Sequence, residues 1–312
     1  MTGQGKGTER DDGRAGRAAI VACGFAPFAV AWRLALRQSV SALALLAGLV
    51  PLGARPAASQ ALPSGGSVAG GRATIGTPAA GSLTVSQSSQ RAVINWNSFS
   101  VGAGGTVSFR QPDASAATLN RVTGTTSSTI AGRVQANGQV YLVNPNGILI
   151  TPTGTVDTSG FTASTLETGD GDFMAGRQRY AGGGRSAGVT NQGTIRVRGG
   201  GDAVLIGGRV SNDGTITAPG GRVGLAAGER VSVDVEGDGF LTVSVPSDDP
   251  DRSQALIRQT GAIRARGGRV EARAATSADV ARAAIQIGGT IEAGEVAPTA
   301  GGVRFGGGAG GA

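Results

Sequence analysis

The side chains that could do chemistry in this sequence are mainly carboxylates, because histidine is absent and the only cysteine is Cys23. A serine–histidine–aspartate triad and a cysteine–histidine nucleophile both need residues that the body of the chain lacks. An ordinary zinc site is excluded for the same reason. The remaining enzymatic options depend on carboxylates, arginine or tyrosine, so the acidic clusters are the first candidates for a site.

Three acidic clusters stand out: GDGD at 169–172, EGDG at 236–239 and SDDPD at 247–251. Their oxygens suit Ca²⁺, but the tandem Gly-Gly-x-Gly-x-Asp nonapeptide of calcium-binding repeats is missing. Solvated turns are the favoured interpretation, and the sequence predicts neither a metal site nor a cofactor. Paired carboxylates could also degrade polysaccharides, but no such pair lies in the regular strands of the repeats described below. We expect no enzyme and no catalytic residue, with a polysaccharide-degrading enzyme as the alternative.

The formal net charge of +7 is largely a property of the N-terminus. Residues 1–61 hold seven basic side chains against three acidic ones. Downstream, single arginines lie next to glycines, without the clustered stripe that is typical of nucleic-acid binding. We therefore expect no nucleic-acid partner.

Residues 1–61 have the features of a secretory signal peptide. Arg33 and Arg37 form a basic flank, an apolar run extends from Val40 to Leu52, and small residues end at Ala61. The apolar run is too short to anchor the chain comfortably in a bilayer. We expect cleavage after Ala61, with Ala58 as the alternative, and export from the cytoplasm.

A second apolar stretch, AAIVACGFAPFAVAW, lies upstream at 18–32. Either translation starts nearer Trp32 or the chain has an extended signal peptide, and both interpretations stay open. In either case Cys23 lies in the removed segment, so we expect an exported protein with neither a disulfide nor a free thiol.

The second half of the chain repeats itself, and the repeats indicate the architecture. NQGTIRVRGG begins at 191 and NDGTITAPGG at 212, a spacing of 21 residues, with degenerate copies at 259 and 287. GGRV recurs at 207–210, 220–223 and 267–270. Apolar residues alternate within each unit, as in a half-buried strand. The Asn-x-Gly and Gly-Gly pairs are expected to supply corners with positive φ.

One such unit cannot bury its apolar face alone, whereas stacked units align Val, Ile and Leu into one long core. The 56 glycines and the low aromatic content fit many short strands and tight turns. We therefore predict an all-β fold, a right-handed parallel β-helix. A β-sandwich or barrel is the alternative, although neither predicts the same unit at coil length. Residues 62–190 are strand-rich but less regular, and we expect an exposed loop at 169–186.

An ordered series of short motifs resembles one protein family. LPSGGSVAGGRATI follows the predicted cleavage site, and then come QSSQRAVINWNSFSVG, VSFRQP, LNRVTG and GRVQANGQVYLVNPNGILI. The series is similar to the N-terminal two-partner secretion domain of filamentous-haemagglutinin-like exoproteins, and it covers about 62–230. The sequence departs from the family pattern at Asn95 and at Ile150–Thr151.

The resemblance implies a β-helix with a capped N-terminus and extra-helical β-hairpins. It implies a secretion domain at 62–230, followed at 231–312 by further coils and a Gly-rich tail. The implied partner is an outer-membrane β-barrel transporter with periplasmic polypeptide-binding domains, and the implied location is outside the cell or at its surface. A role in adhesion or haemagglutination would add a host or cell-surface receptor, or a carbohydrate, as a partner. Since the family commonly continues far beyond this domain, a truncated exoprotein without its adhesive passenger is an alternative.

The motif at 144–147 is the centre of the candidate site. Asn144, Pro145, Asn146 and Gly147 match a type I turn position by position, so their expected local role is a β-helix corner. The resemblance adds recognition during export, which we expect to occur by strand addition of the unfolded chain to a sheet edge of the transporter. Trp96 and Phe99 are expected to fill the core, and Arg91 and Arg121 to form ion pairs or hydrogen bonds to loop carbonyls. The complete set assigned to secretion is Asn144, Pro145, Asn146, Gly147, Ile148, Asn137, Gly138, Arg91, Trp96, Phe99, Asn120 and Arg121.

Overall fold

A computed structural model describes residues 61–184, 186–234, 240–247, 255–275 and 284–294, and the backbone alone of 302–307. Of the predicted signal segment only Ala61 is among them. The acidic cluster at 236–239, and all but the first residue of the cluster at 247–251, lie outside the described residues. Within the described ranges, no helix has the length and apolar character needed to cross a membrane.

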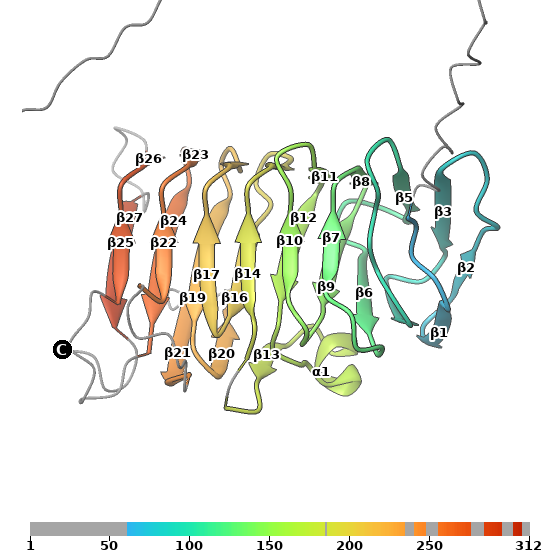
Figure 1. The fold of residues 1–312 in the computed structure, drawn as a ribbon, viewed down its shortest axis with the longest axis horizontal. Helices are drawn as coiled ribbons and strands as arrows, with labels where there is room; N and C mark the ends of the chain where they lie inside the picture. Colours follow the sequence, from blue (N-terminus) through green and yellow to red (C-terminus); the bar gives the residue numbers. More distant parts are fainter. Residues whose placement is uncertain are drawn as a thin grey trace, which may run out of the picture. The chain divides into compact units, whose positions relative to one another are not determined.

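Most of the described chain forms short strands, which fall into three long sheets and one small outer sheet (Figure 1). The first sheet contains, in order, β1 (Ser67–Gly70), β4 (Arg91–Trp96), β6 (Ala117–Val122), β9 (Gln139–Val143), β12 (Gly160–Ser164), β16 (Ala203–Gly207), β19 (Arg222–Ala227), β24 (Arg269–Ala274) and β27 (Gly302–Gly307). The second sheet contains β2 (Ala73–Ile75), β3 (Ser82–Gln87), β5 (Thr106–Arg110), β8 (Arg133–Ala136), β11 (Thr155–Thr158), β15 (Thr194–Val197), β18 (Thr215–Thr217), β23 (Ala262–Arg266) and β26 (Thr290–Gly294).

The third sheet and the outer sheet are smaller. The third sheet contains β7 (Ser128–Ile130), β10 (Ile148–Ile150), β14 (Gly188–Asn191), β17 (Arg209–Asn212), β22 (Ile257–Gln259) and β25 (Ile285–Ile287). The outer sheet contains β13 (Gln178–Ala181), β20 (Arg230–Val233) and β21 (Leu241–Val245). One short helix, α1 (Asp170–Met174), precedes β13.

From β7 onward the chain visits the third, second and first sheets in turn, so each circuit forms one coil. The coils stack in sequence order along the horizontal axis of Figure 1. Thr194 of β15 lies opposite Thr215 of β18, which lies opposite Ala262 of β23. These residues begin the repeated Thr-Ile and Ala-Ile units, so the sequence repeats stack directly on one another. The predicted right-handed parallel β-helix is confirmed.

The N-terminal end of the β-helix is closed by two strands that run against their neighbours. β1 pairs antiparallel with β4, and β2 pairs antiparallel with β3. The next pairs in the same sheets, β4 with β6 and β3 with β5, are parallel. The predicted cap is therefore present, and it gives the first coil hydrogen-bond partners that would otherwise be missing.

The glycines of the Gly-Gly pairs and those of the Asn-x-Gly units have different structural roles. Gly200, Gly220 and Gly267, the first members of Gly-Gly pairs, have φ values of +82°, +66° and +68°, as predicted for corners. The glycines of the Asn-x-Gly units do not have positive φ, so that part of the prediction is wrong. A Cβ atom on Gly214 would instead meet the carbonyl oxygen of Gly193 in the preceding coil. Glycine is required there by the close approach of successive coils.

The first residue of each Asn-x-Gly unit forms a buried ladder of amides. Asn191, Asn212 and Gln259 are at most 1% exposed. Nδ2 of Asn191 donates to Oδ1 of Asn212 at 2.7 Å, and Nδ2 of Asn212 donates to Oε1 of Gln259 at 2.7 Å. Each side-chain amide donates a hydrogen bond to the amide oxygen of the next coil. Glutamine also has such an oxygen, so the degenerate copy that begins with Gln259 keeps the ladder intact.

From β4 to β24, the strands of the first sheet are mainly buried on both faces, unlike the half-buried strands expected from the alternating pattern. All five residues of β12 and all five of β16 are buried. In β16, Leu205 belongs to the main core, whereas Val204 and Ile206 pack in a second core with the outer sheet. The strands of the second sheet keep the predicted alternation, as in β15. Sheets covered on both faces have nearly continuous apolar strands.

Two insertions between coils supply the outer cover. The first insertion lies between β12 and β14 and contributes α1 and β13; the second lies between β19 and β22 and contributes β20 and β21. β20 pairs antiparallel with both β13 and β21, so the predicted extra-helical hairpin is present. The exposed loop predicted at 169–186 is wrong, because this segment includes α1 and β13 and buries Phe173 and Tyr180. It lacks periodicity because it packs on the β-helix through isolated apolar side chains.

Candidate functional site

The motif at 144–147 forms a tightly bonded corner between β9 and β10. The amide N–H of Gly147 donates to the carbonyl oxygen of Asn144 at 3.1 Å, which closes the predicted turn. The Asn144 side chain is fully buried; its Nδ2 donates to the carbonyl oxygen of Thr126 at 3.0 Å and to Oγ of Ser128 at 2.9 Å. Its Oδ1 accepts from the backbone N–H of Asn146 at 3.0 Å. The corner is therefore fixed to the preceding coil.

The rest of the motif differs in exposure. Pro145 and Asn146 are exposed, whereas Gly147 and Ile148 are buried. Nδ2 of Asn146 donates to the carbonyl oxygen of Gly124 at 2.9 Å, which adds a second bond to the preceding coil. Gly147 has a φ of +113°, a conformation that favours glycine. Each polar residue of the motif thus has a structural role in the folded chain.

Trp96 and Phe99 lie in the core beside the cap, as predicted. Each is 1% exposed, and their rings meet edge to face with centroids 5.7 Å apart. Nε1 of Trp96 donates to Oδ1 of Asn120 at 3.0 Å, and the Asn120 side chain is itself fully buried. Asn120 is therefore the polar partner that allows a tryptophan to be buried at this position.

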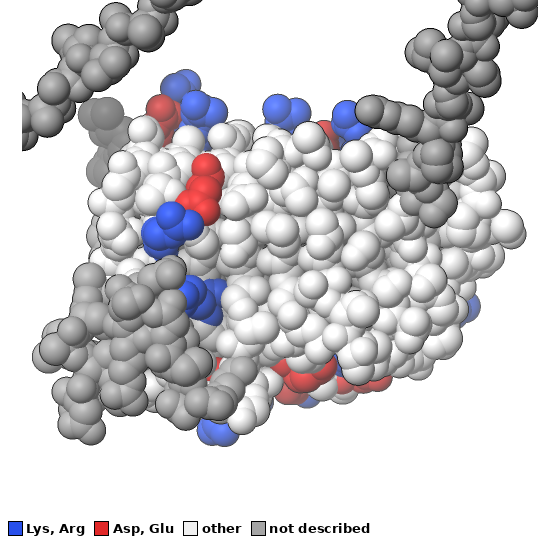
Figure 2. Space-filling view, viewed as in Figure 1, with Lys and Arg blue, Asp and Glu red and all other residues white. Residues whose placement is uncertain are grey.

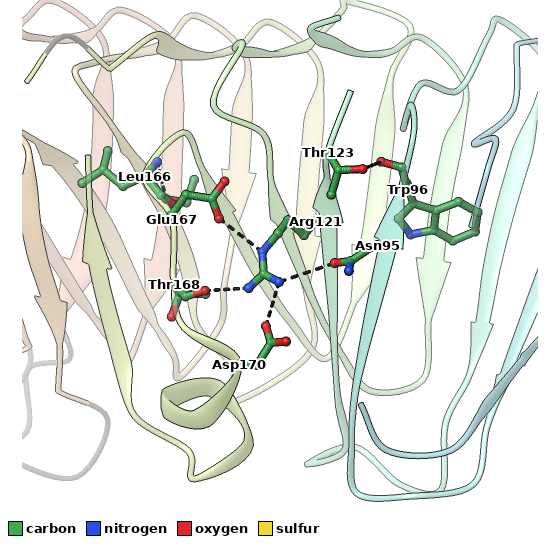
Figure 3. A network of polar contacts seen from close by, with 9 residues as sticks. Asn95, Trp96, Arg121, Thr123, Leu166, Glu167, Thr168 and Asp170 are labelled. Atoms are coloured by element: carbon green, nitrogen blue, oxygen red, sulfur yellow. Dashed lines mark hydrogen bonds and ion pairs between the residues drawn. The ribbon is translucent and has the colours of Figure 1, made fainter. Parts of the chain in front are cut away.

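Arg121 joins the early coils to the first insertion, as Figure 3 shows. Its Nε lies 3.2 Å from Oε2 of Glu167, and its Nη1 lies 2.7 Å from Oδ1 of Asp170. Its Nη2 donates to the carbonyl oxygen of Thr168 at 2.6 Å. The predicted ion pairs and carbonyl bonds of Arg121 are confirmed. Arg91 differs, because its guanidinium carbon lies 5.4 Å from the centre of the Phe173 ring and it forms no ion pair with a described residue.

Asn137 and Gly138 stand at the opposite end of the first-sheet strands, just before β9. Oδ1 of Asn137 accepts from the backbone N–H of Gln111 at 2.7 Å, and Nδ2 donates to the Gln111 carbonyl oxygen at 2.7 Å. Gln111 also accepts from the N–H of Gly138 at 3.0 Å and donates to Thr118 at 3.0 Å. The sequence motif VSFRQP contained Gln111, but its central role in this corner becomes visible only in three dimensions.

The structure therefore separates the predicted residues into two groups. Trp96, Asn120, Arg121 and the motif at 144–147 lie toward the carboxyl ends of neighbouring first-sheet strands, because Val143 pairs with Arg121 and Trp96 pairs with Val122. Arg91, Asn137 and Gly138 lie at the amino ends of those strands. The folded chain does not gather the two groups into one pocket.

The one acidic cluster that the structure describes in full, at 169–172, forms ion pairs. Asp170 pairs with Arg121, and Asp172 lies 2.6 Å from Nε of Arg177. Within the described ranges, no three acidic side chains come close enough together to hold a metal ion. On the face shown in Figure 2, charged side chains lie singly or in pairs of opposite sign, mainly at the margins.

Glu229 connects the two insertions and was not singled out by its sequence context. Its Oε1 accepts from the N–H of Ser186 at 2.8 Å, and its Oε2 accepts from the N–H of Gly184 at 3.0 Å and from Oγ of Ser186 at 2.7 Å. Burial by itself raises the pKa of Glu229, but the hydrogen bonds outweigh it and hold the pKa below the ordinary value of 4.5.

The pKa of Glu229 is lower in the folded chain than in the unfolded chain, so the ionised carboxylate stabilises the fold at pH values above the unfolded-state pKa. This stabilisation is lost as the pH falls through the folded-state pKa. Glu229→Gln should unfold at lower urea concentration than wild type at neutral pH. The difference should narrow as the pH falls below the ordinary glutamate pKa of 4.5. Glu292→Gln, which removes an exposed ion pair with Arg266, is the control and should change little at either pH. If the stability difference between Glu229→Gln and wild type did not change with pH, the ionised carboxylate would not be the source of the stabilisation.

Comparisons with known proteins agree with the sequence motifs. The family model described as "TPS secretion domain", where TPS denotes two-partner secretion, matches residues 58–308. The heme/hemopexin-binding protein of Haemophilus influenzae is 41% identical over 115 residues, which are 37% of this chain and 13% of that protein. The crystal structure of the HMW1 secretion domain from Haemophilus influenzae superimposes with a TM-score of 0.59 at 30% identity, covering 69% of this chain and 59% of that one.

The similarity to the curated relative is confined to a short part of that larger protein, so it describes a shared domain. The family model, in contrast, covers most of this chain, from the predicted cleavage region to the last described strand. The β-helix, the cap and the corner at 144–147 all lie inside the matched range. The chain therefore belongs to the TPS secretion domain family.

Proposed function

We propose that the secretion domain, at 62–230, directs export of this exoprotein through a cognate outer-membrane β-barrel transporter with periplasmic polypeptide-binding domains. The observation that carries the proposal is the family match over residues 58–308. In this scheme the signal peptide at 1–61 takes the chain to the periplasm and is removed after Ala61. The strands from β22 to β27 extend the β-helix outside the cell in this scheme, whereas β20 and β21 belong to the outer sheet.

The burial of Asn144 supports a proposal in which recognition precedes folding. In the folded chain its side chain is fully buried and bonded to the preceding coil, so a partner cannot contact it. In the unfolded chain the same segment is extended and accessible. Strand addition to a sheet edge of the transporter would then use its backbone for affinity and alternate side chains for specificity. Recognition before folding and corner formation after export are therefore compatible roles of one motif.

Folding outside the cell would begin at the N-terminal cap in this proposal. The cap pairs with the first coil on one side only, so each later coil can add to an edge that is already ordered. Adhesion is the downstream role that we propose from the family resemblance. Binding of the purified, folded protein to host cells would test it.

The export test compares cells with and without the transporter gene. We expect the chain in the medium or on the cell surface when the transporter is present, and in the periplasm when it is absent. Within the same cells, Asn146→Ala should lower export several-fold while synthesis stays constant. The bond from Asn146 to Gly124 lies at an exposed position where water can replace it, so its loss costs little folding energy.

Thr153→Ala is the matched control, because Thr153 is also an exposed corner residue that donates one bond to a preceding-coil carbonyl, that of Ala131 at 2.8 Å. Its export should match wild type. If Asn146→Ala were exported as well as wild type, the proposal that the transporter recognises the motif at 144–147 would be wrong. Export that does not depend on the transporter would overturn the proposed function itself.

A further inference from the structure

A groove runs over the outer face of the first sheet, beside the segment from α1 into β13 and the end of β20. It consists of two adjoining hollows of about 720 Å³ and 260 Å³ that share Gln139, Tyr141 and Gln178. The larger is walled by Met174–Arg179 and Ser232–Asp234, and Arg91 lies in it. The smaller continues over β12 to Asp202 and Arg222. The export scheme gives this groove no role.

Three residues of the groove, Arg91, Gln139 and Gly160, lie in one row of register that crosses neighbouring strands of the first sheet. Arg91 of β4 lies opposite Ala117 of β6, which lies opposite Gln139 of β9, and Gln139 lies opposite Gly160 of β12. Strands in a sheet are about 4.8 Å apart. The row therefore follows the β-helix axis, and although Ala117 is fully buried, Arg91, Gln139 and Gly160 line the groove where a linear polymer could lie along this row.

The groove contains unpaired positive charge. Arg179 is exposed, and within the described part of the chain it forms neither an ion pair nor a side-chain hydrogen bond. Arg91 rests on Phe173 and likewise has no carboxylate partner among the described residues. Arg177 lines the same hollow and shares its charge with Asp172. Guanidinium groups in such a position favour carboxylate ligands, which they bind in bidentate geometry.

The remaining lining suits hydroxyl groups. Oε1 of Gln178 is buried without a hydrogen-bond partner among the described residues. The Tyr141 hydroxyl donates to Oε1 of Gln139 at 3.0 Å, and burial raises the pKa of Tyr141 to about 12, so this hydroxyl keeps its proton. Asp202 also lines the groove, but its carboxylate forms an ion pair with the guanidinium of Arg222 at 2.5 Å, so this pair adds no net charge.

We propose that this groove binds a linear acidic polysaccharide whose carboxylates are separated by neutral, hydroxyl-rich sugars. The carboxylates lie against Arg91 and Arg179, and the sugar hydroxyls bond to Gln139 and Gln178. The polymer runs along the β-helix axis, over the register row. Nucleic acids and highly sulfated polysaccharides fit less well, because Arg177 and Arg222 are paired with carboxylates, and the two remaining arginines of the groove, Arg91 and Arg179, are too few to neutralise a dense negative charge.

Calorimetric titration of the folded full chain tests this with three probes: hyaluronan oligosaccharide, which has a carboxylate on every second sugar, neutral dextran and heparin. We expect hyaluronan to bind most tightly and dextran not to bind. Arg179→Gln should weaken hyaluronan binding about tenfold, through loss of one charge-assisted contact. Arg196→Gln is the control, because Arg196 is an exposed arginine on β15 of the second sheet, and it should bind like wild type.

The Arg179 side chain is exposed and forms no hydrogen bond or ion pair with a described residue, so Arg179→Gln should fold normally. An unchanged melting temperature would confirm normal folding. Tightest binding of heparin, equal binding of dextran, or equal affinity of Arg179→Gln and wild type would each overturn the proposal. The titration uses protein that is already folded, so its result is independent of whether a transporter exports the chain.

Discussion

Trp96→Ala is expected to destabilise the β-helix by about 3–5 kcal/mol, the range for truncating a buried aromatic side chain. Trp96 is 1% exposed and contacts Phe99 edge to face. It also lies so close to Gly66 of the cap that any side chain at position 66 would clash with the Trp96 ring. Its removal opens a cavity between the cap and the first coil and leaves Oδ1 of Asn120 without its donor. Urea denaturation of the purified chain measures the loss.

Two further variants separate the causes of this loss. Trp96→Phe keeps most of the ring but still deprives Asn120 of its donor, so we expect an intermediate cost of about 1–3 kcal/mol. Val68→Ala, on the exposed side of the cap strand β1, should change stability little, since Val68 is 39% exposed. If Trp96→Ala were no less stable than Val68→Ala, the cap would not depend on the packing described here. Slower appearance of folded protein outside the cell would connect the cap to the proposed folding start.

Asn212→Ala should be the most damaging substitution within the amide ladder. It removes the acceptor for Nδ2 of Asn191 and the donor for Oε1 of Gln259, both in buried positions. Each buried group left unpaired costs about 1–3 kcal/mol, so the total is about 2–6 kcal/mol. The change in the urea midpoint, at unchanged slope, gives this value.

Gln192→Ala is the matched control for the ladder, because Gln192 is an exposed amide in the middle of the Asn-x-Gly unit that starts at 191. It should stay within about 0.5 kcal/mol of wild type, as surface substitutions usually do. If the two variants lost equal stability, the unit would act through its turn and not through buried amides. The result would also show whether the repeated asparagine is retained for coil stacking.

The sequence alone was sufficient for the local features of the fold. The 21-residue spacing of the Asn-x-Gly-Thr-Ile units predicted coils that stack in register, and the structure has Thr194 opposite Thr215. The pattern at 144–147 predicted a turn, and the bond from Gly147 to Asn144 is present. The aromatic residues Trp96 and Phe99 were correctly placed in the core. These features depend on residues close in sequence or on strict repetition, both of which a sequence displays directly.

Other features were decided only by tertiary structure, because they join segments that share no local pattern. The segment at 169–186 has no periodicity, yet it forms α1 and β13 and packs on the first sheet through Phe173 and Tyr180. β13 pairs with β20, about fifty residues later, and these two strands wall the groove, while β21 pairs with β20 and extends the cover of the outer face. Arg121 meets Glu167 across a comparable separation. The sequence thus determined the β-helix, its period and its family, whereas long-range packing of the two insertions determined which surfaces remain open to a ligand.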